Sequence, residues 1–229
     1  MILPSSRDEG DSRVHAQVKI CGLTTTEAAL AAANAGADYL GFNFYSASPR
    51  SISLSDAAKA LPAIPGHVKN VALVVDPDDA MIDRLLEVPF DVLQLHGSEP
   101  PERVVELRAK ARWEVMKVVG IADAADLEKI GLYEAVADQL LIDAKPPRNA
   151  ELPGGNGVRF DWRLIAGRHW TKPWMLAGGL TPANVAEAIE LTGATQVDVA
   201  SGVEESPGVK SPALMRDFVA AARVNNLAA

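Results

Sequence analysis

Eight short apolar runs at regular intervals constrain the fold of this chain more than any other feature of its sequence. The runs recur every 21 to 34 residues, are rich in Val, Ile and Leu, and read QVKIC, DYLGFNF, NVALVV, VLQLH, WEVMKVV, QLLID, WMLAG and QVDVA. Near-continuous apolar runs are typical of parallel strands that helices cover on both faces. The spacing is that of a strand followed by a helix.

The segments between the runs carry the signals at which helices start and stop. Residues 24–26 precede an Ala-rich run, Ser55 precedes a second helical pattern, and residues 182–184 open a third. Gly36 and Gly193 follow two of these patterns, where a left-handed residue commonly ends a helix. Strands and helices are therefore expected to alternate along the chain.

This alternation predicts an α/β fold: a single (β/α)₈ TIM barrel, with a closed, parallel eight-stranded barrel inside a ring of helices. The barrel is expected over residues 17–229. Residues 1–16 are polar after the first three positions and are expected to form a flexible extension. A doubly wound open sheet is the alternative, but the chain has no GxGxxG or GxxxxGK[ST] motif that would give such a sheet its usual nucleotide.

Composition argues against several classes of partner. The 22 Lys and Arg residues against 30 Asp and Glu give a net charge of −8, so no broad basic surface for nucleic acid is expected. The apolar stretches are shorter than the roughly 18 residues that a membrane span needs. The single cysteine, Cys21, cannot form an internal disulfide, and the N-terminus lacks the apolar core of a signal peptide, which favours a reducing cytoplasm.

Polar residues that end the apolar runs would lie at the active-site end of such a barrel. Cys21 ends the first run, and period-2 alternation places Lys19 on the same face, which suggests a polar barrel interior. A thiolate beside a cation has a lowered pKa and could act as a base, whereas a lone cysteine is otherwise a small buried hydrophobe. Asp143 ends the sixth run, where it could act as an acid or only close the strand with an Asx turn.

Two glycine clusters follow the last two runs. Gly178 and Gly179 close the seventh run, and Ser201 and Gly202 close the eighth. Turn formation would explain either cluster alone. Together they match the position at which (β/α)₈ barrels bind phosphate through backbone N–H groups.

Four more polar residues are candidates for ligand binding. Gln94 and His96 alternate around Leu95 and should face the same side, although a satisfied core histidine is an equal alternative. Arg50 lies in the loop after the second run, where a solvated arginine is the default but a guanidinium could bind a carboxylate. Asp198 faces inward by alternation, where a carboxylate is seldom present for packing. No HxxxH, HxH or CxxC spacing occurs, so no metal site is predicted.

Taken together, the ends of the runs closely resemble the phosphoribosylanthranilate isomerases of tryptophan biosynthesis. The resemblance runs from about Val18 to Arg223 and rests on KICGLT, GFNFYSASPRSIS, LQLHG, LLIDAKPP with GGNGVRFDW, LAGGLTPANV and VDVASGVEESPGVK. It implies one barrel that converts N-(5-phosphoribosyl)anthranilate into 1-(2-carboxyphenylamino)-1-deoxyribulose 5-phosphate, an Amadori rearrangement without metal or organic cofactor. The implied partner is this small molecule, and a monomer is compatible with the sequence.

The resemblance also implies roles for individual residues. Cys21 would be the general base and Asp143 the general acid, Arg50 would bind the anthranilate carboxylate, and Asp198 would lie near the anthranilate amine. The phosphate would be held by Gly178, Gly179, Ser201 and Gly202. Gln94 and His96 complete the expected substrate-binding set.

Three positions depart from the family pattern, and two rival functions stay open. Asp76 follows the third run where members often have Asn, Ala177 stands where Ser is commoner, and GGNG replaces GGTG or GGSG. A histidine-pathway aldose–ketose isomerase would use carboxylates on the first and fifth strands, but these runs end in Cys21 and in WEVMKVVG. A non-catalytic barrel that binds a phosphometabolite is the alternative of a different class.

Overall fold

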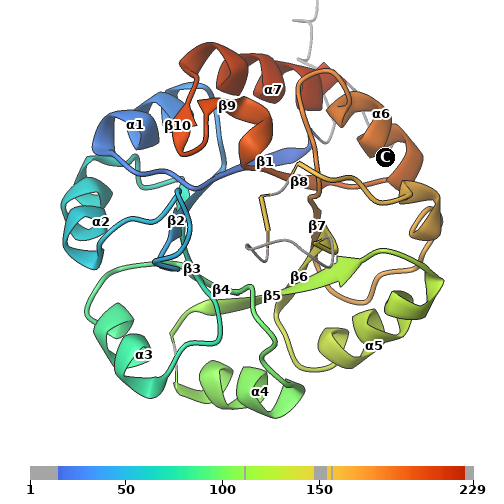
Figure 1. The fold of residues 1–229 in the computed structure, drawn as a ribbon, viewed down its shortest axis with the longest axis horizontal. Helices are drawn as coiled ribbons and strands as arrows, with labels where there is room; N and C mark the ends of the chain where they lie inside the picture. Colours follow the sequence, from blue (N-terminus) through green and yellow to red (C-terminus); the bar gives the residue numbers. More distant parts are fainter. Residues whose placement is uncertain (1–14, 111, 147–153, 156, 225–229) are drawn as a thin grey trace, which may run out of the picture.

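The strands close into a barrel in chain order, and helices form a ring around it (Figure 1). The computed structural model describes residues 15–110, 112–146, 154–155 and 157–224. The barrel strands are β1 (Gln17–Cys21), β2 (Tyr39–Asn43), β3 (Lys69–Val74), β4 (Val92–Leu95), β5 (Glu114–Ile121), β6 (Gln139–Ala144), β7 (Trp174–Leu176) and β8 (Gln196–Val199). The α-helices are α1 (Thr26–Asn34), α2 (Leu54–Ala60), α3 (Asp79–Leu86), α4 (Pro101–Lys110), α5 (Glu128–Glu134), α6 (Val185–Thr192) and α7 (Pro212–Val224). The predicted closed barrel is confirmed and the open sheet is excluded.

Side-chain caps set the helix boundaries. Thr25 caps α1 as the sequence predicts, and Gly193 ends α6 in the left-handed conformation, at φ +71°. The predicted start of α2 at Ser55 is wrong by two residues, because the side chain of Ser53 accepts the hydrogen bond from the backbone N–H of Asp56.

The connection from β6 to β7 differs from the other crossovers. In its described part the only helical element is a single 3₁₀ turn, η3 (Trp162–Leu164), where an α-helix was expected. The sequence AKPPRNAELPGGNG that follows Asp143 explains this, because Pro and Gly are the poorest helix formers.

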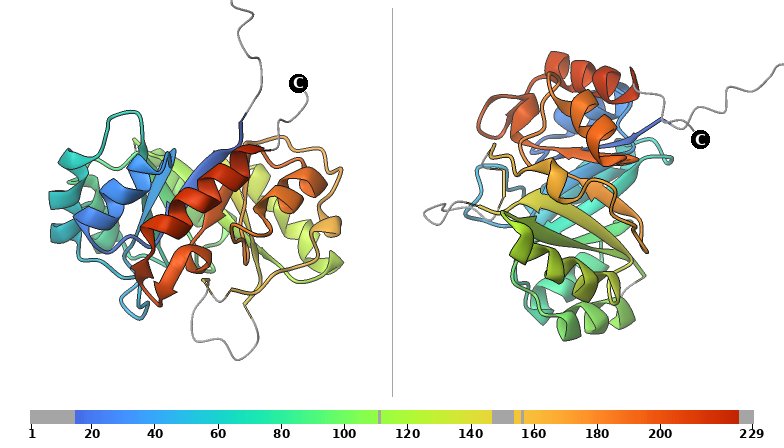
Figure 2. Two further views of the ribbon diagram at one scale, coloured as in Figure 1. Left: turned by 90° about the horizontal axis from the view of Figure 1, so that it is seen from above. Right: turned by 90° about the vertical axis from the view of Figure 1, so that its right-hand side faces the viewer.

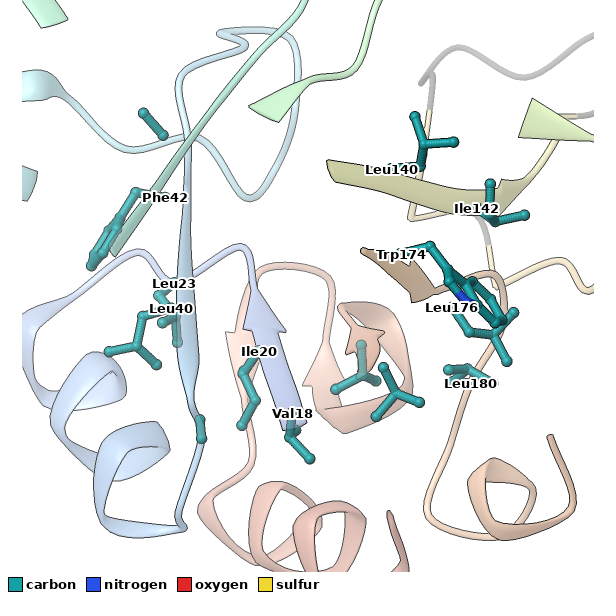
Figure 3. Packing of buried hydrophobic residues seen from close by; sticks show 14 of the residues in the cluster. Val18, Ile20, Leu23, Leu40, Phe42, Leu140, Ile142, Trp174, Leu176 and Leu180 are labelled. Atoms are coloured by element: carbon teal, nitrogen blue, oxygen red, sulfur yellow. The ribbon is translucent and has the colours of Figure 1, made fainter. Parts of the chain in front are cut away.

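Alternation along the strands divides the core into two layers. Residues of one parity, among them Val18, Ile20, Leu40 and Phe42, form the layer between the barrel and its helices (Figure 3). Residues of the other parity fill the barrel itself: Tyr39, Val71, Val92, Met116, Val118, Leu141, Met175 and Ala177. Lys19, Gln94, Asp143 and Asp198 share the inward parity, so the sequence pattern places polar groups inside the barrel.

A small hairpin follows β8. Its strands β9 (Glu204–Ser206) and β10 (Val209–Lys210) pair antiparallel at the end of the barrel opposite the one where the chain enters β1 (Figure 2). It therefore lies at the carboxyl ends of the barrel strands.

The structure bears only in part on the predicted N-terminal extension and on the predicted lack of a membrane span. Residues 1–14 of the predicted extension lie outside the described residues, and Ala16 is buried directly before β1. The domain boundary at residue 16 therefore stays a prediction. No helix of the described ranges is long and apolar enough to span a membrane.

Candidate active site

A cavity opens at the carboxyl ends of the barrel strands. All ten residues that the sequence singles out line this one cavity: Cys21, Arg50, Gln94, His96, Asp143, Gly178, Gly179, Asp198, Ser201 and Gly202. These residues come from β1, β4, β6 and β8 and from the loops after β2, β4, β7 and β8, so only the closed barrel brings them together. This is the location of the active site in barrels of this class.

Cys21 lies at the end of β1 inside a buried charge network. Lys19 is fully buried two residues before it and donates to Asp198 Oδ1 at 2.8 Å. Burial lowers the pKa of Lys19, but Asp198 and Cys21 outweigh this effect and hold the pKa above its ordinary value. An ammonium group therefore lies beside the thiol.

The pKa of Cys21 itself is raised, which contradicts the lowered pKa expected from the sequence. Burial of the thiol is the largest cause, and the nearby Asp198 carboxylate adds to it. Lys19 and Lys210 act in the opposite direction without cancelling the effect of burial. A thiol of this kind ionises less readily but is a stronger base once it has ionised.

Two glycines make room around Cys21. A Cβ atom on Gly41 of β2 would lie 2.7 Å from the Cys21 sulfur. Gly22 has φ +80°, and a Cβ there would lie 2.8 Å from Cδ of Arg50. The glycine after the cysteine in KICG therefore serves the backbone turn and the close approach of Arg50.

Asp143 ends β6 across the cavity next to His96. Its Oδ1 accepts a hydrogen bond from the backbone N–H of Ala144 at 2.7 Å, and its Oδ2 lies 3.5 Å from His96 Nε2. Gln94 Nε2 lies 3.2 Å from His96 Nδ1, and it donates to this nitrogen in the tautomer whose ring proton is on Nε2. One oxygen of Asp143 is thus paired with the backbone at the end of the strand, and the other lies toward His96.

Two buried polar atoms of this group have no partner among the described residues. They are Gln94 Oε1 and His96 Nε2. An unpaired buried acceptor or donor costs about 1 to 3 kcal/mol, so a ligand that pairs with these atoms would recover this cost. Their position on the cavity wall makes them candidate ligand contacts.

Arg50 is buried and paired, not solvated as its loop position suggested. Its Nε and Nη2 donate to the two carboxylate oxygens of Glu204 at 2.8 and 2.9 Å. Lys210 donates to the same carboxylate at 2.6 Å. Burial raises the pKa of Glu204, but Arg50 and Lys210 outweigh burial and hold the pKa below its usual range.

The two glycine clusters form adjoining loops. Gly178 and Gly179 have φ of +87° and +62°, which few other residues adopt. A Cβ on Gly202 would lie 1.9 Å from the backbone oxygen of Leu180, so the loop after β8 packs directly on the loop after β7. Among the described residues, the backbone N–H groups of Gly178 and Gly179 donate to no partner, which suits them to an anion.

The family assignment follows from comparison with known proteins. The family model described as N-(5'phosphoribosyl)anthranilate (PRA) isomerase matches residues 18–221. The chain belongs to the N-(5'-phosphoribosyl)anthranilate isomerase family. A curated N-(5'-phosphoribosyl)anthranilate isomerase of Cereibacter sphaeroides (strain ATCC 17023) is 57% identical over 208 residues, which cover 90% of this chain and 98% of the relative.

Solved structures of PRA isomerases share the fold. The phosphoribosylanthranilate isomerase of Thermotoga maritima superposes with a TM-score of 0.82 at 37% identity, and the match covers 90% of this chain and 98% of that chain. Another solved PRA isomerase structure, in complex with reduced 1-(o-carboxyphenylamino)-1-deoxyribulose 5-phosphate, has a TM-score of 0.77 at 34% identity, and the match covers 90% of this chain and 98% of that chain.

The departures from the PRA isomerase pattern have structural places in this chain. Asp76 has φ +45°, a conformation that Asn and Asp adopt more readily than most residues, and its Oδ1 accepts a hydrogen bond from Ser98 N at 2.7 Å. Ala177 is buried inside the barrel and lines the cavity. Neither residue contacts Cys21 or Asp143 through a hydrogen bond.

The sequence did not reveal Glu204 and Lys210 as the buried charged residues behind Arg50 in this PRA isomerase. Both lie in SGVEESPGVK, and the Pro207–Gly208 pair between them is a turn signal. A hairpin read from that signal would have brought the two side chains together. Their contact with Arg50, 154 positions away from Glu204, has no local signature.

Proposed function

We propose that this protein is an aldose–ketose isomerase that converts N-(5'-phosphoribosyl)anthranilate into 1-(2-carboxyphenylamino)-1-deoxyribulose 5-phosphate in tryptophan biosynthesis. The observation that carries the proposal is that a thiol and a carboxyl group, Cys21 and Asp143, line one cavity together with a guanidinium and two glycine loops. The family assignment supports it. Proton transfer between positioned groups is sufficient for an Amadori rearrangement.

Asp143 is the proposed general acid. In its protonated form it would donate to the furanose ring oxygen, so that the ring opens and the anthranilate nitrogen becomes an iminium. His96 Nε2 lies 3.5 Å from Asp143 Oδ2 without a hydrogen bond, and a small shift on substrate binding would let it donate to this carboxyl group. Gln94 would act through His96, because its amide fixes the position of the ring proton.

Cys21 is the proposed general base. As a thiolate it would remove the proton from C2' of the iminium and leave an enolamine, which tautomerises to the ketone. Lys19 and Lys210 both favour the thiolate, while burial opposes it. The base would therefore form only in a fraction of the ligand-free molecules, but it would be strong.

The remaining residues would hold the charged ends of the substrate. Arg50 would bind the anthranilate carboxylate, and Asp198 would lie near the anthranilate amine. The phosphate would bind to the glycine loops after β7 and β8, at Gly178, Gly179, Ser201 and Gly202. Anion binding by backbone N–H groups in such loops is general in (β/α)₈ barrels.

The rival isomerase with two catalytic carboxylates fits this cavity less well. Such an enzyme would need a carboxylate at the end of β5, and this strand ends in Gly120 and Ile121. A non-catalytic binding barrel would not require the acid and base to share the cavity. Turnover decides between an enzyme and a binding protein.

The test is an assay of the purified full chain on phosphoribosylanthranilate generated in situ, because the compound is labile. We expect conversion to the aminodeoxyribulose phosphate and loss of conversion in Asp143→Ala. Binding of the reduced product analogue without any turnover by the unchanged chain would contradict an isomerase and favour the binding barrel.

We also propose that the protein acts in the cytoplasm and needs no metal. The lone cysteine is the reason for the first proposal. The second rests on the chemistry, which consists of proton transfers alone. Among the described residues, no group of three or more His, Cys, Asp or Glu side chains is arranged to hold a metal ion.

A further inference from the structure

The hairpin after β8 packs closely against the loop that carries Arg50. Gly208, at the hairpin turn, has φ +84°, and a Cβ there would lie 2.5 Å from the backbone oxygen of Pro49. Thr24 Oγ1 donates to the backbone oxygen of Gly208 at 3.4 Å. The hairpin thus presents Glu204 and Lys210 to Arg50 on a backbone held from two sides.

The three side chains form one buried cluster. Glu204 receives two hydrogen bonds from Arg50, at 2.8 and 2.9 Å, and one from Lys210 at 2.6 Å. Lys210 Nζ also donates to the backbone oxygen of Ala200 at 2.9 Å. The exposed fractions of the side chains are 8% for Arg50, 5% for Glu204 and 1% for Lys210, so water screens their charges weakly.

The charge of this cluster depends on Lys210. Arg50 and Glu204 alone form a neutral pair, which would offer a substrate carboxylate little net attraction. With Lys210, one carboxylate lies between two cations, and the cluster keeps a single positive charge. Lys210 therefore offsets the charge of Glu204, so that Arg50 can still attract a substrate carboxylate.

Within the described ranges, the geometry also leaves one nitrogen of the Arg50 guanidinium without a partner. Its Nε and Nη2 are used by Glu204, and among the described residues Nη1 has no hydrogen-bond partner. Arg50 lines the cavity. A Cβ on Gly155 would lie 2.6 Å from Nη1, so any larger residue at this position would crowd the nitrogen. A carboxylate in the cavity would meet Nη1.

We propose that Glu204 and Lys210 are positioning residues for the anthranilate carboxylate: Glu204 orients Arg50, and Lys210 neutralises Glu204 so that the site keeps a net positive charge. This inference rests on the proposed function, because it takes the carboxylate of the substrate as the ligand of Arg50. It assigns to the β9–β10 hairpin the selection of substrates that carry a negative charge at this end.

The test is equilibrium binding of two matched ligands to the full chain. One is reduced 1-(o-carboxyphenylamino)-1-deoxyribulose 5-phosphate, and the other is the same compound without the carboxylate. Lys210→Met keeps the volume of the side chain and makes the cluster neutral. Glu204→Gln in the Lys210→Met background returns the net charge to one positive. Binding is measured instead of turnover because Lys210 also favours the thiolate of Cys21.

We expect Lys210→Met to raise the dissociation constant of the carboxylate ligand at least tenfold and that of the carboxylate-free ligand less than threefold. The double variant should bind the carboxylate ligand at least fivefold more tightly than Lys210→Met alone. A double variant as weak as Lys210→Met, or equal weakening of both ligands by Lys210→Met, would overturn the proposal, because a purely structural lysine would behave in this way.

A second variant decides the matter if Lys210→Met does not fold. Glu204→Gln alone raises the cluster charge and keeps one oxygen that accepts a hydrogen bond from Arg50. It should therefore bind the carboxylate ligand within threefold of the unchanged protein or more tightly. A larger loss would show that the second hydrogen bond from Arg50 to the Glu204 carboxylate matters more than the charge that Lys210 supplies, and it would overturn the role assigned to Lys210.

Arg50→Ala separates this inference from the proposed function. If this variant weakens both ligands equally, Arg50 does not bind the carboxylate and the proposed substrate role fails. If Arg50→Ala weakens only the carboxylate ligand while the charge-restoring variant recovers nothing, the proposed function stands and the inference on Lys210 fails.

Discussion

Cys21 combines two properties that oppose each other at a single atom. Its burial disfavours the thiolate, and the two nearby ammonium groups of Lys19 and Lys210 favour it. Burial is the larger effect in the ligand-free protein, so the pKa is raised. The thiol is therefore mostly protonated at neutral pH, and its rate of reaction with an alkylating reagent should rise as the solution becomes more alkaline.

The pH dependence of alkylation measures this balance directly, because Cys21 is the only cysteine of the chain. The rate of reaction with iodoacetamide should rise with pH to a midpoint above the ordinary thiol pKa of about 8.5. Lys19→Met should move the midpoint further up, since the cation that favours the thiolate is lost.

A bound ligand provides the control for this experiment. Because Cys21 lines the cavity, saturation with the reduced product analogue should protect it from alkylation. A midpoint below pH 8 in the free protein would contradict a pKa raised by burial.

At the scale of elements, β4 and β5 are tied together by a buried ion pair outside the cavity. Lys117 of β5 and Glu99 after β4 are each 2% exposed and lie 2.8 Å apart. Glu99 also accepts hydrogen bonds from the backbone N–H groups of Asp76 and Gly97. This pair therefore orders the two loops that flank His96.

Lys117→Met should destabilise the protein by about 3 to 5 kcal/mol, because it leaves the Glu99 carboxylate buried without its cation. Urea unfolding monitored by circular dichroism measures the change in the free energy of unfolding. Adding Glu99→Gln to Lys117→Met should return part of the loss. A loss under about 1 kcal/mol in Lys117→Met would show that the backbone N–H groups alone satisfy Glu99.

The loops after β7 and β8 form a second coupled pair of elements. A Cβ on Gly202 would collide with the backbone oxygen of Leu180, at 1.9 Å, so Gly202→Ala must move the two loops apart. Binding of the reduced product analogue should weaken at least about tenfold, which corresponds to roughly 1.4 kcal/mol. Isothermal titration calorimetry measures this affinity.

Gly193→Ala is the matched control for that experiment. Gly193 ends α6 with φ +71°, and a Cβ there would have no atom within 4 Å. This variant should lose about 1 to 2 kcal/mol of stability through backbone strain while its affinity stays unchanged. Equal affinity in Gly202→Ala and Gly193→Ala would argue against the loops as the phosphate site.

At the scale of the whole molecule, the parts that the sequence predicts are those that repeat. The interval between apolar runs predicts the closed barrel, and alternation around Leu95 and Val197 predicts which polar residues face inward. The regular geometry of strands explains this success, because the side-chain period of two holds wherever a strand forms.

The parts that the sequence could not predict depend on distances across the barrel. The pairing of Arg50 with Glu204 joins residues 154 positions apart, so the loop position of Arg50 wrongly suggested a solvated side chain. The direction of the pKa shift of Cys21 depends on how much burial outweighs two lysines, and spacing carries no information on that sum. The described part of the connection from β6 to β7 lacks an α-helix, which the regular alternation does not predict but the Pro and Gly residues of this connection indicate.

Single-turnover kinetics of Cys21→Ser and Asp143→Ala test most directly whether Cys21 and Asp143 transfer the protons. Each variant should slow conversion of phosphoribosylanthranilate by at least about 10²-fold, while the dissociation constant of the reduced product analogue changes by less than about fivefold. Serine keeps the volume of Cys21 and removes the readily ionised group. Near-normal turnover of Cys21→Ser would instead make Cys21 a small buried hydrophobe and contradict the account.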